Sequence, residues 1–272
     1  MSAKKPLDPT DERKFMENRA ELLAHITRLA EEAGALILEI YNSNFDVRQK
    51  GDGSPVTMAD EAAEAHIMAG LRELTPDIPA VGEEESSQGI SVDIGSGPFW
   101  LVDPLDGTNE FVNRRDEFTV NIGLIEDGQP TIGVVHAPAK DVTYAGAGPG
   151  TATRRQGTEP AKPIHARSMP ATGAVVTASR AHGDQKKIQQ LMDARSINRM
   201  IITGSSIKFC LIAAGEADIY PRYGHTREWD TAAAHAVLAA AGGTVRTLAG
   251  DELKYGKDSF LNPEFIAQGR DS

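Results

Sequence analysis

The acidic residues of this chain are concentrated where short apolar stretches end, and the clearest case is the segment FWLVDPLDGTNEF. There Asp103 and Asp106 lie three residues apart, directly after an apolar run. Pro104 fixes its own φ and Gly107 permits backbone conformations that other residues resist, so we expect the chain to reverse here and both carboxylates to face one point. With the Leu105 carbonyl they would form a corner of hard oxygen ligands, which Mg²⁺ prefers. An acidic β-turn would explain the same residues without a metal, and this segment alone does not decide between the two.

Three further acidic residues occupy comparable places. Glu83 is the first glutamate of VGEEE, Asp60 ends the segment SPVTMAD, and Asp230 lies in REWDTAAAHAV. Each has an ordinary explanation: a solvated run of charge for Glu83, a capping box with Thr57 for Asp60, and helix capping for Asp230. Their shared position at the ends of elements, beside Gly, Pro or Trp, favours a common metal site. Two Mg²⁺ ions about 4 Å apart could stabilise the entering and leaving oxygens of a phosphoryl group, so a site of this kind would suit phosphoryl-transfer chemistry.

The segment GSSIKF is a candidate for binding an anion. Ser205 and Ser206 stand where a predicted strand passes into a predicted helix. Free backbone N–H groups at such a helix start favour phosphate, and Lys208 adds a positive charge one turn further on. N-capping by the two serines is the ordinary explanation. Arg222 follows the next predicted strand, in YPRYG, and would add a second cation to the same pocket.

Apolar residues at helical spacing and short β-branched runs predict the elements that position these groups. We expect helices over 12–41, 58–74, 184–192, 205–214 and 231–241, and strands over 80–82, 99–102, 173–180, 200–204, 217–221 and 243–247. The run FTVNIGLIEDGQPTIGVVHAP predicts a hairpin that turns at Asp127-Gly128, and the Gly-rich segment 146–158 predicts a loop. The first half, 1–160, is therefore predicted to be α+β with antiparallel strands, and the second half, 161–272, to be α/β.

Composition limits the class of protein. The 272 residues are 40% hydrophobic and 25% charged, which is typical of a folded protein with a buried core. With 28 Lys+Arg against 39 Asp+Glu the formal net charge is −11, so nucleic-acid polymers are not expected as partners. The single cysteine, Cys210, suits a reducing compartment, no segment approaches the ~20 apolar residues of a membrane span, and the start lacks the apolar stretch of a signal peptide. We expect a cytoplasmic protein; a homodimer and a peripheral association with the inner membrane are left open.

The motifs GEE, DPLDGT and WDTAA, in this order and spacing, resemble the inositol monophosphatase superfamily of lithium-sensitive, Mg²⁺-dependent phosphatases. The resemblance extends from the first helix to DSFLNPEF near the end, and it implies a layered α-β-α-β-α sandwich of the sugar-phosphatase type. A narrower match, carried by SPVTMAD, WLVDPLDGTNEF, EFTVNIGLI, GSSIKFCLIAAGEADIYPRYG and WDTAAAHAV, is to the bacterial 3′(2′),5′-bisphosphate nucleotidases. This match implies hydrolysis of the 3′-phosphate of adenosine 3′,5′-bisphosphate, the nucleotide formed in sulfate assimilation, to AMP and phosphate.

The resemblance also implies a set of metal ligands. Glu83, Asp103 and the Leu105 carbonyl would hold one Mg²⁺, and Asp103, Asp106 and Asp230 would hold a second. Clustered carboxylates repel one another, so their pKa values should be raised when no cation is bound.

Catalytic and substrate roles follow from the same resemblance. Asp60 would lie near a weaker third ion or orient a water, and Thr108 would polarise the attacking water together with Glu83 or Asp60. The implied substrate contacts are Gly107, Thr108, Asn109, His182, Gly204, Ser205, Ser206, Lys208, Arg222 and Asp230. The nucleotidases usually carry a lysine where this chain has Asn109, and DGTN followed by an aromatic residue is closer to the inositol-phosphatase pattern.

Two alternatives to a nucleotidase therefore stay open. One is the same chemistry on inositol or fructose phosphates. The other is a catalytically silent member that binds a nucleotide as a regulator, which loss of a metal carboxylate or of Thr108 would indicate, yet all of these are present. The segment GAGPGTA suggests a nicotinamide-dependent oxidoreductase only superficially, because it follows a hairpin and does not open a βαβ unit.

Overall fold

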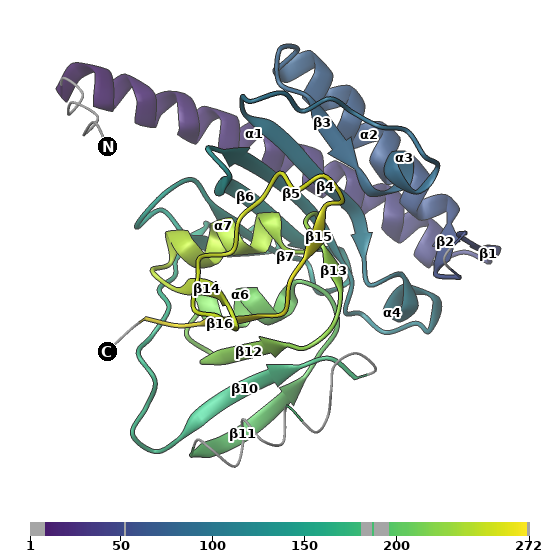
Figure 1. Ribbon diagram of the computed structural model, residues 1–272. Coiled ribbons are helices and arrows are strands. Elements are labelled where there is room, and N and C mark those ends of the chain that lie inside the picture. The colour runs from purple at the N-terminus through teal and green to yellow at the C-terminus, as the bar shows by residue number, and fades with distance from the viewer. Residues whose placement is uncertain (1–8, 52, 181–186, 188–195, 271–272) are drawn as a thin grey trace.

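The computed structural model describes the backbone of residues 9–51, 53–180, 187 and 196–270, with side chains from residue 18 onward. Within this part of the chain, Figure 1 shows α1 (Pro9–Tyr41) and α2 (Met58–Leu74) on one face of a large sheet. The helices α6 (Ile207–Ala213) and α7 (Ala232–Ala240) lie between that sheet and a smaller one. The layers are helix, sheet, helix and sheet, which confirms the predicted layered α+β class. The helix expected over 184–192 lies outside the described residues, apart from Lys187.

The large sheet has the order β3-β4-β5-β6-β7-β8-β9 in the described part of the chain. Its strands are β3 (Ala80–Gly82), β4 (Phe99–Asp106), β5 (Thr119–Glu126), β6 (Gln129–Ala137), β7 (Val142–Gly146), β8 (Thr153–Gln156) and β9 (Lys162–Pro163). β3 and β4 are parallel, and the later neighbours are antiparallel. The hairpin β5–β6 turns at Asp127 and Gly128 with φ of 51° and 72°, which confirms the predicted turn. The predicted loop over 146–158 is wrong in part, because β8 forms within it.

The smaller sheet has the order β11-β10-β12-β16-β14 among the described residues. Its strands are β10 (Ala174–Ala178), β11 (Ile197–Ile202), β12 (Ile219–Arg222), β14 (Thr244–Thr247) and β16 (Phe265–Gln268). β10 runs parallel to β11 and β12, whereas β16 lies antiparallel between β12 and β14. The bounds of the predicted strand over 200–204 are wrong, because β11 starts and ends earlier. The division at residue 160 remains a prediction.

Several short elements could not be predicted from the sequence, because they contain too few residues to show a hydrophobic period. They are β1 (Val47–Gln49), β2 (Pro55–Thr57), α3 (Glu83–Ser87), α4 (Thr108–Val112), the 3₁₀ turn η1 (Pro138–Lys140), β13 (Thr226–Arg227) and β15 (Leu261–Asn262). β1 pairs with β2, and β13 pairs with β15. Among the described helices, none is both long enough and apolar enough to span a membrane.

A row of glycines explains how closely α7 approaches the large sheet. Gly123, Gly133 and Gly146 are direct partners across β5, β6 and β7. A Cβ atom on Gly133 would lie 2.2 Å from the carbonyl oxygen of Ala233, so only glycine fits there. The alanine-rich helix therefore rests almost on the sheet backbone, and Asp230 lies just before its N-cap residue, Thr231.

Candidate metal and phosphate site

A β-bulge in β4 turns two aspartates to the same side of the sheet. Asp103 is paired with Asn121 and Asp106 with Thr119, so three steps along β4 match two along β5. Residues three apart on a regular strand would point to opposite faces, and the extra residue corrects this. The expected chain reversal and the alternative β-turn are both wrong, because β4 continues through Pro104 to Asp106. A proline is tolerated there because a bulge leaves a ladder position unpaired.

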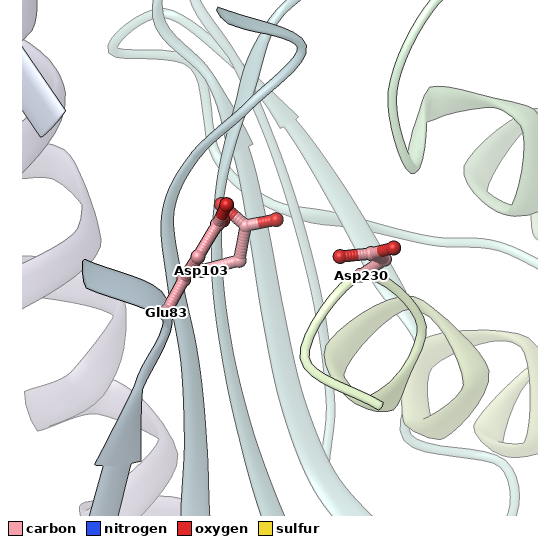
Figure 2. A group of neighbouring side chains, drawn as sticks. All are labelled: Glu83, Asp103 and Asp230. Carbon is pink, nitrogen blue, oxygen red and sulfur yellow. The ribbon is translucent and has the colours of Figure 1, made fainter. Parts of the chain in front are cut away.

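Three carboxylates from distant parts of the sequence converge beside this bulge. Glu83 lies where β3 passes into α3, Asp103 lies on β4, and Asp230 lies in the loop before α7 (Figure 2). Each offers an oxygen atom, and these oxygens all lie within 4.8 Å of one another. The capping explanation for Asp230 is wrong, because α7 has Thr231 at its N-cap and no side-chain cap bond, whereas Asp230 accepts the Arg227 N–H at 2.8 Å.

Asp60 and Thr108 form a second polar pair next to the carboxylates. The predicted capping box is confirmed: Thr57 caps α2, and Asp60 Oδ2 accepts the Thr57 N–H at 2.8 Å. The other oxygen of Asp60 lies 3.1 Å from the Thr108 hydroxyl, which is also 3.2 Å from the Leu105 carbonyl oxygen. Gly107, with φ of 95°, makes the left-handed turn that places Thr108 at the start of α4. The Asp60 side chain thus takes part in the capping box of α2 and also bonds Thr108 beside the carboxylates.

The start of α6 is joined to the carboxylates by hydrogen bonds. Asp106 Oδ2 accepts the Ser206 N–H at 2.6 Å and lies 3.4 Å from Asn121 Nδ2, while Ser206 Oγ bonds Asn121 Oδ1 at 2.8 Å. The Gly204 N–H donates to Glu117 Oε2 at 2.9 Å. We expected N–H groups here to be free for phosphate, and at these two residues that is wrong. Ser206 occupies the N-cap position of α6, but its side chain makes no cap bond, and Ser205 Oγ lies 3.4 Å from the Ile207 N–H.

The cations of the site lie on α6 and at the end of β12. Lys208 is buried, its Nζ donates to the carbonyl oxygens of Ser205 at 2.5 Å and Thr203 at 3.4 Å, and burial lowers its pKa to about 8. Ser205 has φ of 50°, so the ammonium group holds a left-handed turn in place. Arg222 donates through Nη2 to the His225 carbonyl at 2.8 Å, but its buried Nε has no hydrogen-bond partner among the described residues.

A pocket of about 230 Å³ connects these groups. The predicted site residues that line it are Glu83, Asp103, Leu105, Asp106, Gly107, Thr108, Asn109, Gly204, Ser205, Ser206, Lys208, Arg222 and Asp230. Asp60 does not line the pocket and reaches it through Thr108. His182 lies outside the described residues.

Three carboxylates of the pocket have raised pKa values, as predicted for acids clustered without a cation. Burial raises the pKa of Asp103 well above its usual range, and Glu83, Asp106 and Asp230 raise it further. Burial and then Asp106 raise the pKa of Asp230 to about 8. Burial raises the pKa of Asp106 to about 6, although the positive charge of Lys208 opposes this. These groups would gain stability from a cation placed between them.

The comparison with known proteins identifies the family. Residues 18–270 match the model of the inositol monophosphatase family. The chain belongs to this family. It is 46% identical over 251 residues to the 3′(2′),5′-bisphosphate nucleotidase CysQ of Escherichia coli K12, over 90% of this chain and 98% of the relative.

Solved structures of the inositol monophosphatase family agree with this result. One is CysQ from Bacteroides thetaiotaomicron, 34% identical, with a TM-score of 0.79 over 93% of this chain and 98% of that one. Another is an inositol monophosphatase from Anabaena, 24% identical, with a TM-score of 0.72 over 93% and 92% of the two chains. The second likeness concerns the fold alone.

The inositol monophosphatase family generally depends on Mg²⁺, and the donors of this chain fit that ion. The converging groups are carboxylates, a carbonyl oxygen lies beside them at Leu105, and Mg²⁺ takes oxygen ligands of this kind. Asp103 is 1% exposed and faces three other acids, an arrangement that a divalent cation would stabilise.

Two charged residues next to the site were missed in the sequence. Lys50 is nearly buried, and its Nζ lies 2.7 Å from Glu83 Oε1 and 2.6 Å from Glu84 Oε1. The explanation of these glutamates as a solvated run is therefore wrong. Burial raises the pKa of Glu84 to about 7 and that of Glu64 on α2 also to about 7. No spacing rule connects Lys50 or Glu64 with Glu83, so only the fold reveals the contacts.

Proposed function

We propose that this chain is a Mg²⁺-dependent phosphatase that hydrolyses the 3′-phosphate of adenosine 3′,5′-bisphosphate to AMP and phosphate. The observation that carries the proposal is one pocket with two kinds of lining: carboxylates around Asp103 and cations at Lys208 and Arg222. A substrate with two phosphates needs both, one phosphate beside the metal ligands and the other beside the cations. The name of the E. coli relative supports this choice of substrate.

Two Mg²⁺ ions would be held by the acids of the pocket: one by Glu83, Asp103 and the Leu105 carbonyl, the other by Asp103, Asp106 and Asp230. When bound, Mg²⁺ neutralises phosphate charge and lowers the pKa of a coordinated water. Burial raises the pKa of Asp103 well above its usual range and that of Asp230 to about 8, so protons compete with this binding at both carboxylates.

Thr108 and Asp60 orient the attacking water. The Thr108 hydroxyl donates its proton to Asp60 Oδ1, 3.1 Å away, which leaves Thr108 Oγ1 free to accept a hydrogen from water. Burial raises the pKa of Asp60 to about 6, so this acid is ionised and able to accept above about that pH. A third ion beside Asp60 would compete with this hydrogen bond.

The second phosphate would lie against Arg222 and Lys208. The buried Nε of Arg222 lacks a partner among the described residues, and an anionic oxygen would satisfy it. Lys208 has two of its three N–H bonds engaged with carbonyl oxygens, so the third can point to the ligand.

The proposed location of the protein is the cytoplasm, a reducing compartment that suits a chain with a single cysteine.

Asn109 favours one second candidate, an inositol monophosphatase. This exposed side chain lines the pocket next to Thr108 and adds no charge beside the phosphate to be cleaved. The test is phosphate release from adenosine 3′,5′-bisphosphate, inositol 1-phosphate and fructose 1,6-bisphosphate, each with Mg²⁺ and with chelator. We expect the highest kcat/KM for the nucleotide and no turnover in chelator. A higher kcat/KM for inositol 1-phosphate would select the second candidate instead.

A further inference from the structure

The short helix that begins with Glu83 lacks a cap of its own. Its N-cap residue is Gly82, which has no side chain to accept a hydrogen bond. In most helices the N-cap side chain accepts from the N–H groups two or three positions on, which here belong to Glu84 and Glu85. Buried N–H groups without an acceptor are costly, so another part of the chain must supply one.

Glu64 of α2 supplies that acceptor. Its Oε2 accepts the Glu84 N–H at 2.8 Å, and its Oε1 accepts the Glu85 N–H at 2.7 Å. The side chain is 4% exposed, so water does not compete freely for the carboxylate. A Cβ atom on Gly82 would lie 2.5 Å from Glu64 Oε2, which means that the carboxylate occupies the place of a capping side chain.

This contact holds Glu83 between two rigid elements. On one side Gly82 is in register with Val102 of β4, one residue before Asp103. On the other side Glu64 lies one turn after Asp60, and both are buried on α2. The pairing of Gly82 with β4 and the hydrogen bonds from Glu84 and Glu85 to Glu64 therefore fix the backbone on either side of Glu83. The Glu83 carboxylate offers an oxygen within 4.8 Å of oxygens of Asp103 and Asp230.

We propose that Glu64 is a positioning residue of the metal site: it caps α3 from a neighbouring helix and so fixes the backbone that carries Glu83. The inference rests on the proposed function, because it assigns Glu83 to Mg²⁺. Groups that orient a metal ligand without touching the metal typically change metal affinity about 10–100-fold when they are removed. Glu64→Ala should raise the Mg²⁺ dissociation constant, measured by calorimetry on the full chain without substrate, by a factor in this range.

A rescue variant separates capping from a general loss of packing. Gly82 has φ of −100° and ψ of 151°, which any residue can adopt, so a serine there could cap α3 once Glu64 is shortened. Gly82→Ser alone should weaken Mg²⁺ binding, because its Cβ would clash with the Glu64 carboxylate. Glu64→Ala with Gly82→Ser should bind Mg²⁺ more tightly than either single variant.

The control is Leu71→Ala, which removes a buried side chain from the same helix two turns beyond Glu64. It should lower Tm without changing the Mg²⁺ dissociation constant. If Glu64→Ala does not fold, Glu64→Gln replaces it, because the amide keeps the volume and only one acceptor. Unchanged Mg²⁺ affinity in the Glu64 variant, or weaker binding in the double variant than in Glu64→Ala, would overturn the inference and leave the proposed function intact. A wild-type chain that binds no Mg²⁺ would overturn both.

Discussion

The glycine row on the large sheet offers the strictest test of how the fold positions the site. In Gly133→Ala the new Cβ would lie 2.2 Å from the Ala233 carbonyl oxygen, and real Cβ contacts are essentially never shorter than 3.0 Å. α7 and β6 must therefore separate by about 0.8 Å or more, and Asp230 precedes that helix. Overpacking of this kind typically costs about 1–3 kcal/mol of stability. A shift of about 1 Å at reacting groups can cost about 100-fold in rate.

The assay is the Mg²⁺ dependence of phosphate release, together with Tm, for three matched variants. Gly146→Ala presses on Ala240 at the far end of α7, so it should lower Tm but affect the Mg²⁺ requirement less than Gly133→Ala. Gly97→Ala, where a Cβ meets nothing within 4 Å, should change neither quantity. Wild-type Mg²⁺ dependence in Gly133→Ala, at a Tm that has clearly fallen, would refute the claim that this packing sets the position of Asp230.

Three further outcomes follow from the site. Asp103→Asn should reduce kcat by more than tenfold, which corresponds to about 1.4 kcal/mol of barrier, with the fold intact by circular dichroism; near-normal kcat would remove Asp103 from the metal site. Without Mg²⁺, Tm should fall as the pH rises from about 4 to about 8, because the folded chain holds protons on Asp230 and its neighbours more tightly than the unfolded chain does. A flat or rising Tm would contradict the pKa of about 8 for Asp230. Lys208→Ala should cut kcat/KM for adenosine 3′,5′-bisphosphate by about one to two orders of magnitude, because a charge-assisted hydrogen bond contributes about 1.5–3 kcal/mol. The kcat/KM for inositol 1-phosphate should fall less, since only the nucleotide loses a phosphate contact. Equal losses would mean that Lys208 serves the Ser205 turn alone.

Residues in long periodic segments could be placed from the sequence, since their pattern is local. The bounds of α2 agree at both ends, and the Asp127-Gly128 hairpin forms where its turn chemistry predicts it. The bulge at Pro104 could not be predicted, because it depends on the register with β5. The same holds for β16, whose four residues gain their strand conformation from pairing with β12 and β14.

Most of the predicted site residues line one pocket, yet several of their hydrogen-bond and ion-pair partners could not be predicted. Asp60 was suspected of either capping or function, and the structure gives it both contacts. Lys208 lines the pocket, but the sequence did not indicate that two of its three N–H groups donate to the carbonyl oxygens of Ser205 and Thr203. Lys50 and Glu64 approach Glu83 and its helix only through the tertiary fold, because nothing in local sequence brings α2 or the β1–β2 loop beside α3.

The central claim concerns which phosphate is released and what that step requires. Phosphorus NMR of adenosine 3′,5′-bisphosphate during turnover distinguishes the two phosphates in one sample. We predict that with Mg²⁺ the 3′ signal is replaced by inorganic phosphate while the 5′ signal persists as AMP, and that chelator stops the reaction reversibly. Loss of the 5′ signal, undiminished turnover in chelator, or no turnover beside rapid hydrolysis of inositol 1-phosphate would contradict the account.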